Sequence, residues 1–175
     1  MAELYTRPIQ RGLDMYRNRN AYCYLYGAKG AVLRTRQDVL NFFAAEPGYF
    51  AKYSNEEKEQ IIRNSVGKIA FDCSGFTGHC TGDKQWSTGQ INNCSLITTP
   101  RDGVAGSLLY TTFGGKGRHI GLDIGYGFCL DMGYESTDAA VREGRDSVRL
   151  TRISETAWEK SGRSRVLDYT GATNL

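Results

Sequence analysis

The sequence predicts an α+β fold, with helices in about residues 1–95 and an antiparallel sheet of about five strands in about residues 104–170. Apolar residues repeat at helical spacing through the first part, whereas the second part consists of short alternating segments separated by glycine-containing turns. Because the predicted helices precede the predicted strands along the chain, we expect a domain in which a helix from the first half packs on the sheet. With 175 residues and no internal repeat or linker, the chain is predicted to form a single domain, residues 1–175.

The first predicted helix lies near the N-terminus. Ile9, Leu13 and Tyr16 recur at helical spacing, and Pro8 is compatible with a first turn, where its missing N–H would have no partner. The segment AYCYLYGAKG (21–30) then combines aromatic residues with two glycines. We expect it to end the helix and to form an extended piece that leads into a turn.

Two capping boxes mark the next helices. Thr35 with Asp38 precedes one apolar stripe, and Ser54 with Glu57 precedes another. A fourth helix is expected to begin near Asp72. The stretch DKQWSTGQINN that follows has no sustained period, so it is predicted to be irregular surface with at most one helical turn.

The predicted strands are short, and they begin only after this irregular stretch. They are GSLLYTTF, HIGLDIG, GFCLDMG, SVRLTR and SRVLDY. The first three follow one another at hairpin-like spacing, which indicates antiparallel pairing.

The composition is that of a globular protein without a dominant charge. The 22 basic and 19 acidic residues are interspersed and give a net charge of +3, so no nucleic-acid-binding stripe is indicated. The N-terminal residues lack the continuous apolar run of a secretory signal or a membrane span. The five cysteines include no C-x-x-C pair and are interpreted as free thiols. We therefore expect no nucleic-acid partner and no membrane insertion, and a monomer is the working expectation for the oligomeric state.

Cys73 is the first candidate for chemistry, because FDCSGFTGHC (71–80) places it at the predicted start of a helix. There the positive end of the helix dipole and the free backbone N–H groups favour the thiolate, and the same groups could stabilise an oxyanion. Asp72 is a candidate cap for this helix, and Gly75 permits close approach of another group. The alternative is that Cys73 is simply a small buried side chain, as free cysteines often are.

A nucleophilic cysteine needs a base, and the chain has two histidines, His79 and His119. On a helix that starts at Cys73, His79 would lie about 9 Å along the axis and point away from the sulfur, so a surface or packing role is predicted. His119 opens the segment HIGLDIG after a glycine-rich turn, where a strand end can present its side chain toward a cleft. His119 is therefore the candidate base.

Asp131 is the candidate group that orients the imidazole. If HIGLDIG and GFCLDMG form a hairpin around residues 125–127, residues whose numbers sum to about 252 lie opposite each other. Asp131 then lies beside Gly121 and diagonal to His119. A register slip of one or two residues would instead leave Asp131 exposed at the surface.

Taken together, these segments resemble the NlpC-type, papain-like cell-wall cysteine peptidases. That family carries D-C-S-G followed by an apolar residue, a strand like P-G-D-L-V-F, the strand H-V-G-I-Y-I-G, and a third polar residue roughly one strand later. The corresponding segments here are DCSGF, GSLLY, HIGLDIG and Asp131, and YLYGAKG resembles the aromatic–glycine turn that precedes the nucleophile in the family. The resemblance spans residues 22–133.

The resemblance implies a papain-like fold, in which the helix of the nucleophile packs on the antiparallel sheet. It also implies cleavage of an amide bond in the stem peptide of peptidoglycan, commonly beside D-glutamate. Cys73 would be the nucleophile and His119 the base, and no metal or other cofactor would be required. Tyr24, Asp72 and Ser74 would help to bind the peptide, although each could equally be a cap or a packed side chain.

The sequence departs from the family pattern in three places. A long helical insert, residues 31–70, separates the tyrosine turn from Cys73, a spacing that resembles phage-type or mobile-element lysins. Asp123 stands where the family usually has an aromatic or aliphatic residue, and by strand alternation it shares a face with His119, where it either contacts substrate or faces solvent. The third position is more often histidine, asparagine or glutamine, so Asp131 is expected to hold the imidazolium more strongly and to raise its pKa.

Three other interpretations are compatible with these residues. A zinc site could draw on Cys73, Cys80, His119 and either Cys94 or Cys129, but these lack the tight pairs of structural zinc ligands. A wall-binding domain without turnover is disfavoured, because an activated thiolate there would only be liable to oxidation. Another acyl transfer on the same site, such as crosslinking or N-acetylmuramoyl-L-alanine amidase activity, stays open. The cysteines other than Cys73 are most simply packed thiols.

The expected partner is the peptidoglycan stem peptide, and the expected place of action is the bacterial cell wall. Because the chain carries no export signal, we expect its release by lysis or by a membrane-permeabilising partner, or its cleavage from a larger chain.

Overall fold

The computed structural model describes residues 2–133 and 147–173, which form an α+β fold. The helices are α1 (Thr6–Arg17), α2 (Arg36–Ala45), α3 (Pro47–Phe50), α4 (Asn55–Ser65), α5 (Cys73–Thr81) and α6 (Ser87–Asn92), with short 3-10 helices η1 (Arg19–Ala21), η2 (Pro100–Asp102) and η3 (Ile153–Glu155). The strands are β1 (Glu3–Leu4), β2 (Tyr22–Tyr24), β3 (Lys29–Val32), β4 (Ile69–Phe71), β5 (Cys94–Thr98), β6 (Leu108–Phe113), β7 (Lys116–Gly125), β8 (Phe128–Met132), β9 (Val148–Arg152), β10 (Lys160–Ser164) and β11 (Leu167–Asp168). None of the described helices is both long and apolar enough to cross a bilayer.

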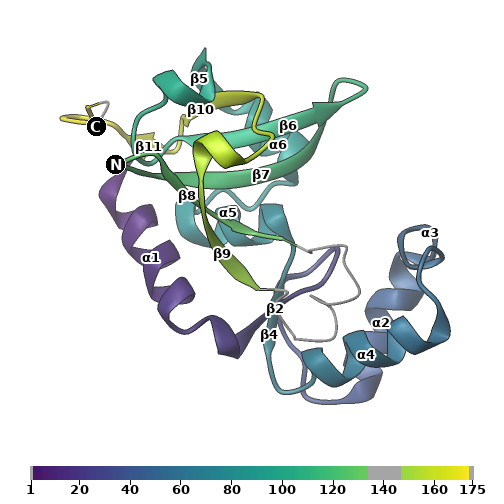
Figure 1. Ribbon diagram of the computed structural model, residues 1–175. Coiled ribbons are helices and arrows are strands. Elements are labelled where there is room, and N and C mark those ends of the chain that lie inside the picture. The colour runs from purple at the N-terminus through teal and green to yellow at the C-terminus, as the bar shows by residue number, and fades with distance from the viewer. Residues whose placement is uncertain (1, 134–146, 174–175) are drawn as a thin grey trace.

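The main layer is a six-stranded sheet with the order β5-β10-β6-β7-β8-β9. Its neighbouring strands are antiparallel throughout. The β7–β8 hairpin has the predicted register, because Gly121 lies opposite Asp131. A smaller sheet of order β2-β4-β3 and the parallel pair β1-β11 complete the described strands. In Figure 1, α1 and α5 lie along the large sheet, whereas α2, α3 and α4 gather beside the small one.

Helix α5 packs against the large sheet, as predicted for a helix from the first half. Phe76 and Cys80 of α5 share a core with Ile120 and Leu122 of β7 and with Leu130 of β8. Almost every residue of α5 is buried, and its small residues allow this close packing on all sides. A helix buried all round is held in place by its surroundings, so its first residue is fixed relative to the sheet.

The insert forms a small helical layer with a core of its own. The capping boxes at Thr35 and Ser54 are both present, and the helices α2 and α4 follow them. Val39, Phe50 and Ile62 pack in a cluster separate from that of α5. This cluster also contains buried residues of β2 and β4, so the insert packs against the small sheet and not against the large one.

One strand of the large sheet was misplaced in the sequence analysis, and another was missed. The segment SRVLDY was predicted as a strand, but the long strand there is β10, with the sequence KSGRS, and only β11 lies within SRVLDY. Strand β10 is central and pairs with both β5 and β6. Its small polar residues give no apolar alternation, and its backbone pairing on both sides supplies the stability instead. Strand β5 follows the stretch DKQWSTGQINN and was not among the predicted strands, and its partner β10 is distant in sequence.

Candidate active site

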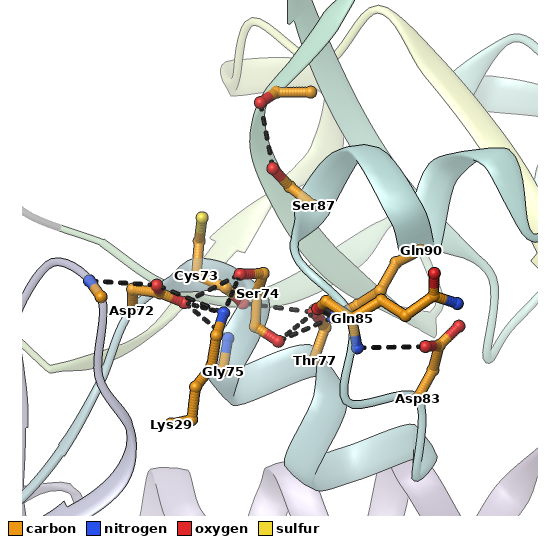
Figure 2. Close-up of polar contacts among 12 residues, drawn as sticks. Lys29, Asp72, Cys73, Ser74, Gly75, Thr77, Asp83, Gln85, Ser87 and Gln90 are labelled. Atoms are coloured by element: carbon orange, nitrogen blue, oxygen red, sulfur yellow. Dashed lines mark hydrogen bonds and ion pairs between the residues drawn. The ribbon is translucent and has the colours of Figure 1, made fainter.

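Cys73 is the first residue of α5, at the helix N-terminus as predicted. Asp72 is the N-cap, and its Oδ1 accepts a hydrogen bond from the backbone N–H of Gly75 at 2.6 Å. The N–H groups of Cys73 and Ser74 belong to the first turn, where a helix offers no internal acceptor. The sulfur therefore lies at the positive end of the helix, and Figure 2 shows it directed away from the side chains of Asp72 and Ser74.

A buried glutamine supports this first turn. The amide nitrogen of Gln90 donates to the carbonyl oxygen of Ser74 at 2.7 Å, and the hydroxyl of Thr77 donates to the amide oxygen of Gln90, also at 2.7 Å. Gln90 is fully buried and comes from α6, so these bonds tie α6 to the start of α5 (Figure 2). Buried hydrogen bonds of this kind hold a reactive group in one position.

His119 and Asp131 meet on one face of the large sheet. Nε2 of His119 lies 2.6 Å from Oδ2 of Asp131, and only 2% of the Asp131 side chain is exposed. The side chain of Cys73 lies near enough to His119 to contribute to the raised pKa of the ring. Because Asp131 occupies Nε2, Nδ1 is the ring nitrogen left for the sulfur. The structure thus brings together the three residues that the sequence nominated for catalysis.

The ring of His119 holds a proton more strongly than an ordinary imidazole. Burial opposes protonation, but the hydrogen bonds with Asp131 and Cys73 outweigh it and raise the pKa of His119 to about 9. The direction of this shift is the one predicted from the aspartate at position 131.

Arg149 is a partner of Asp131 that the sequence did not reveal. Its Nε donates to Oδ1 of Asp131 at 3.1 Å, and a second guanidinium nitrogen contacts Oδ2. Burial tends to raise the pKa of Asp131, but the bonds with His119 and Arg149 lower it below its ordinary value. Asp131 is therefore held as a carboxylate. Arg149 comes from β9, whose register with β8 cannot be inferred across the long connection between them.

Trp158 is a second residue that the sequence missed. Its ring is stacked on the ring of His119, with centroids 5.2 Å apart and planes within 6°. Gly121 makes room for it, because a Cβ at this position would lie 2.9 Å from the indole. The indole N–H also donates to the sulfur of Cys129 at 3.3 Å. Trp158 lies in an irregular segment, where no periodicity points to a contact.

An open groove of about 640 Å³ runs beside His119 and Asp131. We call it the His119 groove. Its walls include Tyr24, Tyr26, Tyr49 and residues 156–159. Burial, then the neighbouring Tyr49 and Cys73, raise the pKa of Tyr24, so its hydroxyl stays neutral. Tyr24 therefore lies at the groove, where the sequence expected a peptide contact, and its binding role stays a prediction.

Asp72 and Ser74 lie behind the nucleophile and not in the groove. Both are buried, and both contact the ammonium of Lys29, which lies 3.0 Å from Oδ1 of Asp72. The Lys29 ammonium also lies 4.1 Å from the centroid of the Trp86 ring. A Cβ on Gly75 would collide with the strand that carries Lys29, so this glycine allows the cluster to form. The binding role of Asp72 and Ser74 stays a prediction, and any substrate contact there would involve Lys29.

The remaining candidates lie elsewhere. His79 is exposed on α5, and its ring packs 5.3 Å from that of Phe71, in keeping with the predicted surface or packing role. Across the described residues, no group of three or more histidine, cysteine, aspartate or glutamate side chains is close enough to hold a metal ion.

Comparison with known proteins identifies the fold. No protein-family model and no curated protein sequence matches the chain. Solved structures do match. The NlpC/p60 domain of the peptidoglycan hydrolase SagA superimposes with a TM-score of 0.53 and 16% identity, over 90% of this chain and 97% of that one. This chain has the NlpC/p60 fold.

Two mycobacterial structures agree with this identification. The peptidoglycan hydrolase RipB of Mycobacterium tuberculosis matches with a TM-score of 0.51 and 15% identity, over 94% of this chain and 67% of that one. The P60 domain of an M. avium subspecies paratuberculosis antigen also has a TM-score of 0.51, with 14% identity, over 94% of this chain and 98% of that one. The papain-like α+β fold expected from the resemblance is thereby confirmed.

Within this NlpC/p60 fold, the cysteines other than Cys73 are buried free thiols, as predicted; they are Cys23, Cys80, Cys94 and Cys129. Burial raises the pKa of Cys80 and of Cys94 to about 12, and it also raises that of Cys129. These thiols stay protonated at neutral pH, and a protonated thiol is a poor nucleophile.

We expect iodoacetamide at pH 7 to modify Cys73 before any other cysteine of the folded protein. Cys73 lies at the helix N-terminus and near the ring of His119, whereas Cys80 is fully buried. Peptide mass spectrometry at short reaction times would measure the label on each thiol. Equal labelling of Cys73 and Cys80 in folded protein would contradict this expectation.

Asp123 shares the His119 face of β7, and of its two expected roles only exposure to solvent is wrong; a substrate contact stays a prediction. It is 4% exposed, so it does not face solvent, and its Oδ1 accepts a hydrogen bond from the N–H of Gly125 at 2.8 Å. It lines a second pocket of about 570 Å³, together with residues of η2 and η3. Burial raises the pKa of Asp123 from 3.8 to about 6.

Asp123→Asn is expected to stabilise the protein at pH 7.5 by about 3 kcal/mol. Because the folded pKa of Asp123 exceeds the unfolded one, ionisation of this acid weakens the fold as the pH rises from about 4 to about 6. Asparagine keeps the acceptor for Gly125 and removes the charge. Urea unfolding at pH 4 and pH 7.5 would measure the effect, with exposed Glu155→Gln as the control. A gain in stability that is equal at both pH values would contradict this account.

Proposed function

We propose that this protein is a peptidoglycan hydrolase of the bacterial cell wall that cleaves an amide bond in the stem peptide beside D-glutamate. The observation that carries the proposal is the chain of contacts from Cys73 at a helix N-terminus, through His119, to Asp131 at the edge of an open groove. The NlpC/p60 fold supports it, since SagA and RipB, which share the fold, are peptidoglycan hydrolases. The insert of residues 31–70 gives a spacing that resembles phage-type or mobile-element lysins, and on this basis we further propose that the protein is a lysin of that type.

In the proposed first step, the Cys73 thiolate attacks the carbonyl carbon of the scissile amide. A C–S bond forms, and the π electrons of the carbonyl move to its oxygen. In this proposal the backbone N–H groups of Cys73 and Ser74 stabilise the oxyanion, because both belong to the first turn of α5. The imidazolium of His119 then gives its proton to the amide nitrogen, the C–N bond breaks, and the amine leaves.

In the proposed second step, His119 is a neutral base. It takes a proton from water, and the resulting hydroxide attacks the acyl-enzyme carbon. The C–S bond breaks, which returns the thiolate and releases a carboxylic acid that loses its proton to solvent. The Asp131 carboxylate accepts a hydrogen bond from the other ring N–H in both steps. It stabilises the imidazolium, which gives up its proton in the first step and forms again in the second. Trp158, stacked on the ring, excludes water from one of its faces.

The proposal is tested by incubating the protein with purified sacculi and following turbidity. Mass spectrometry of the soluble fragments then identifies the new ends. A new amine on the residue after D-glutamate supports the endopeptidase. Release of intact stem peptides would instead show an N-acetylmuramoyl-L-alanine amidase, and binding to sacculi without any new end would show a wall-binding domain.

A further inference from the structure

The His119 groove has two cations that no described acid neutralises. Lys52 and Arg118 both line the groove and are exposed. Among residues 2–133 and 147–173, neither forms an ion pair with a carboxylate. The two described acids that line the groove, Asp131 and Glu159, bind groups other than Lys52 and Arg118. Asp131 binds His119 and Arg149, and Glu159 accepts hydrogen bonds from the backbone and the hydroxyl of Thr112.

Arg118 reaches the groove through a β-bulge. Strand alternation alone would turn it away from the face of His119. The pairing of β6 with β7 shifts between Thr111, which lies opposite His119, and Thr112, which lies opposite Gly117. Arg118 is the extra residue at this shift. Bulges re-aim a side chain, and here the result is that Arg118 lines the same groove as His119.

Lys52 reaches the groove from the insert. Its ammonium lies 3.8 Å from the centroid of the Tyr49 ring, and Tyr49 is stacked on Tyr26 at 3.9 Å. Both tyrosines line the groove. The aromatic faces hold the ammonium at the wall without supplying an acceptor for its N–H donors. The insert therefore adds a positive charge to the wall of the site.

We propose that Lys52 and Arg118 bind a carboxylate of the substrate, so that the enzyme prefers stem peptides whose D-glutamate carries a free α-carboxylate over those in which it is amidated. The inference rests on the proposed function. When D-glutamate is linked through its side-chain carboxyl, its α-carboxyl lies three carbons from the scissile carbonyl, close enough to meet the groove wall. Two cations without acidic partners attract a carboxylate but gain little from a neutral amide.

The test uses two synthetic stem peptides that differ only in a free or amidated α-carboxyl at D-glutamate. Chromatography of the products would give kcat/KM for each, on the same enzyme preparation. We expect the wild type to prefer the acid by about tenfold, the size of one charge-assisted contact. Lys52→Met and Arg118→Met should each lower the ratio of acid to amide toward one, and Lys84→Met, which removes an exposed lysine outside the groove, should keep the wild-type ratio.

The possible failures are distinguishable. Equal cleavage of the two peptides by the wild type, or an unchanged ratio in both groove variants, would overturn the inference and leave the proposed function standing. Clearing of sacculi without cleavage of either peptide would place the cut elsewhere. It would overturn the inference together with the proposed cleavage beside D-glutamate, and only the coarser proposal of a peptidoglycan hydrolase would stand. An enzyme that neither clears sacculi nor cuts either peptide would overturn the proposed function, and this preference with it.

Discussion

Cys73→Ala is expected to lower the rate of sacculus clearing by at least about 10³-fold, because the proposed reaction forms its covalent bond at this sulfur. His119→Ala should have an effect of similar size, since the same unit of residues performs both proton transfers. The two losses should not add in the double variant, because either change alone disables the unit. Turbidity and fragment analysis of each variant would measure these rates.

A matched control separates loss of the nucleophile from loss of the fold. Cys94→Ser also removes a thiol from the main core, but Cys94 lies outside the groove, and serine keeps a donor for the Gln90 carbonyl that this thiol now contacts. This variant should clear sacculi at close to the wild-type rate. Thermal unfolding of all variants would verify that they are folded. Wild-type clearing by folded Cys73→Ala would refute catalysis at this site.

Asp131→Asn is expected to lower kcat/KM by about 10²-fold or more and to move the alkaline limb of its pH profile to lower pH. The Asp131 carboxylate contributes to the pKa of about 9 at His119. A raised pKa means that the imidazolium persists until the pH passes about 9. Without the carboxylate it is lost nearer the ordinary value of 6.5, and the remaining charge of Arg149 disfavours it further.

Profiles of kcat/KM between pH 5 and pH 10 would measure this shift. Asp123→Asn is the control, because Asp123 lies on the same face of β7 but bonds to Gly125 and not to the imidazole. Its alkaline limb should stay in place. If the alkaline limb of Asp131→Asn coincides with that of the wild type, the proposed coupling between the carboxylate and the ring is absent.

Local signals predicted much of the fold correctly. The capping boxes at Thr35 and Ser54, the helix start at Asp72 and the register of Gly121 with Asp131 all depend on residues close in sequence. A cap is a bond between side chain and backbone three residues apart, and a tight hairpin sets its own register. Such features are readable because few alternative geometries satisfy them.

The sequence was less informative wherever the partner was distant. Strand β10 is polar and was misplaced, because its pairing with β5 and β6 stabilises it in place of an apolar pattern. Lys29 and Arg149 are ordinary cations in the sequence, yet each meets a buried aspartate from a remote element. Trp158 stacks on His119 from an irregular segment.

The amino-acid order alone determined which side chains could take part in chemistry: a thiol on a helix start, a histidine on a strand and an aspartate across a short hairpin. His119 was predicted to open its strand, but β7 begins at Lys116, so the histidine lies within the strand. Only the tertiary structure decided what surrounds them. The burial and the charges that raise the pKa of His119, the bulge that turns Arg118 into the groove and the insert that brings Lys52 there all depend on packing between distant segments. Local bonds specify a residue's own geometry, whereas its electrostatic environment is a sum over neighbours that only the folded chain assembles.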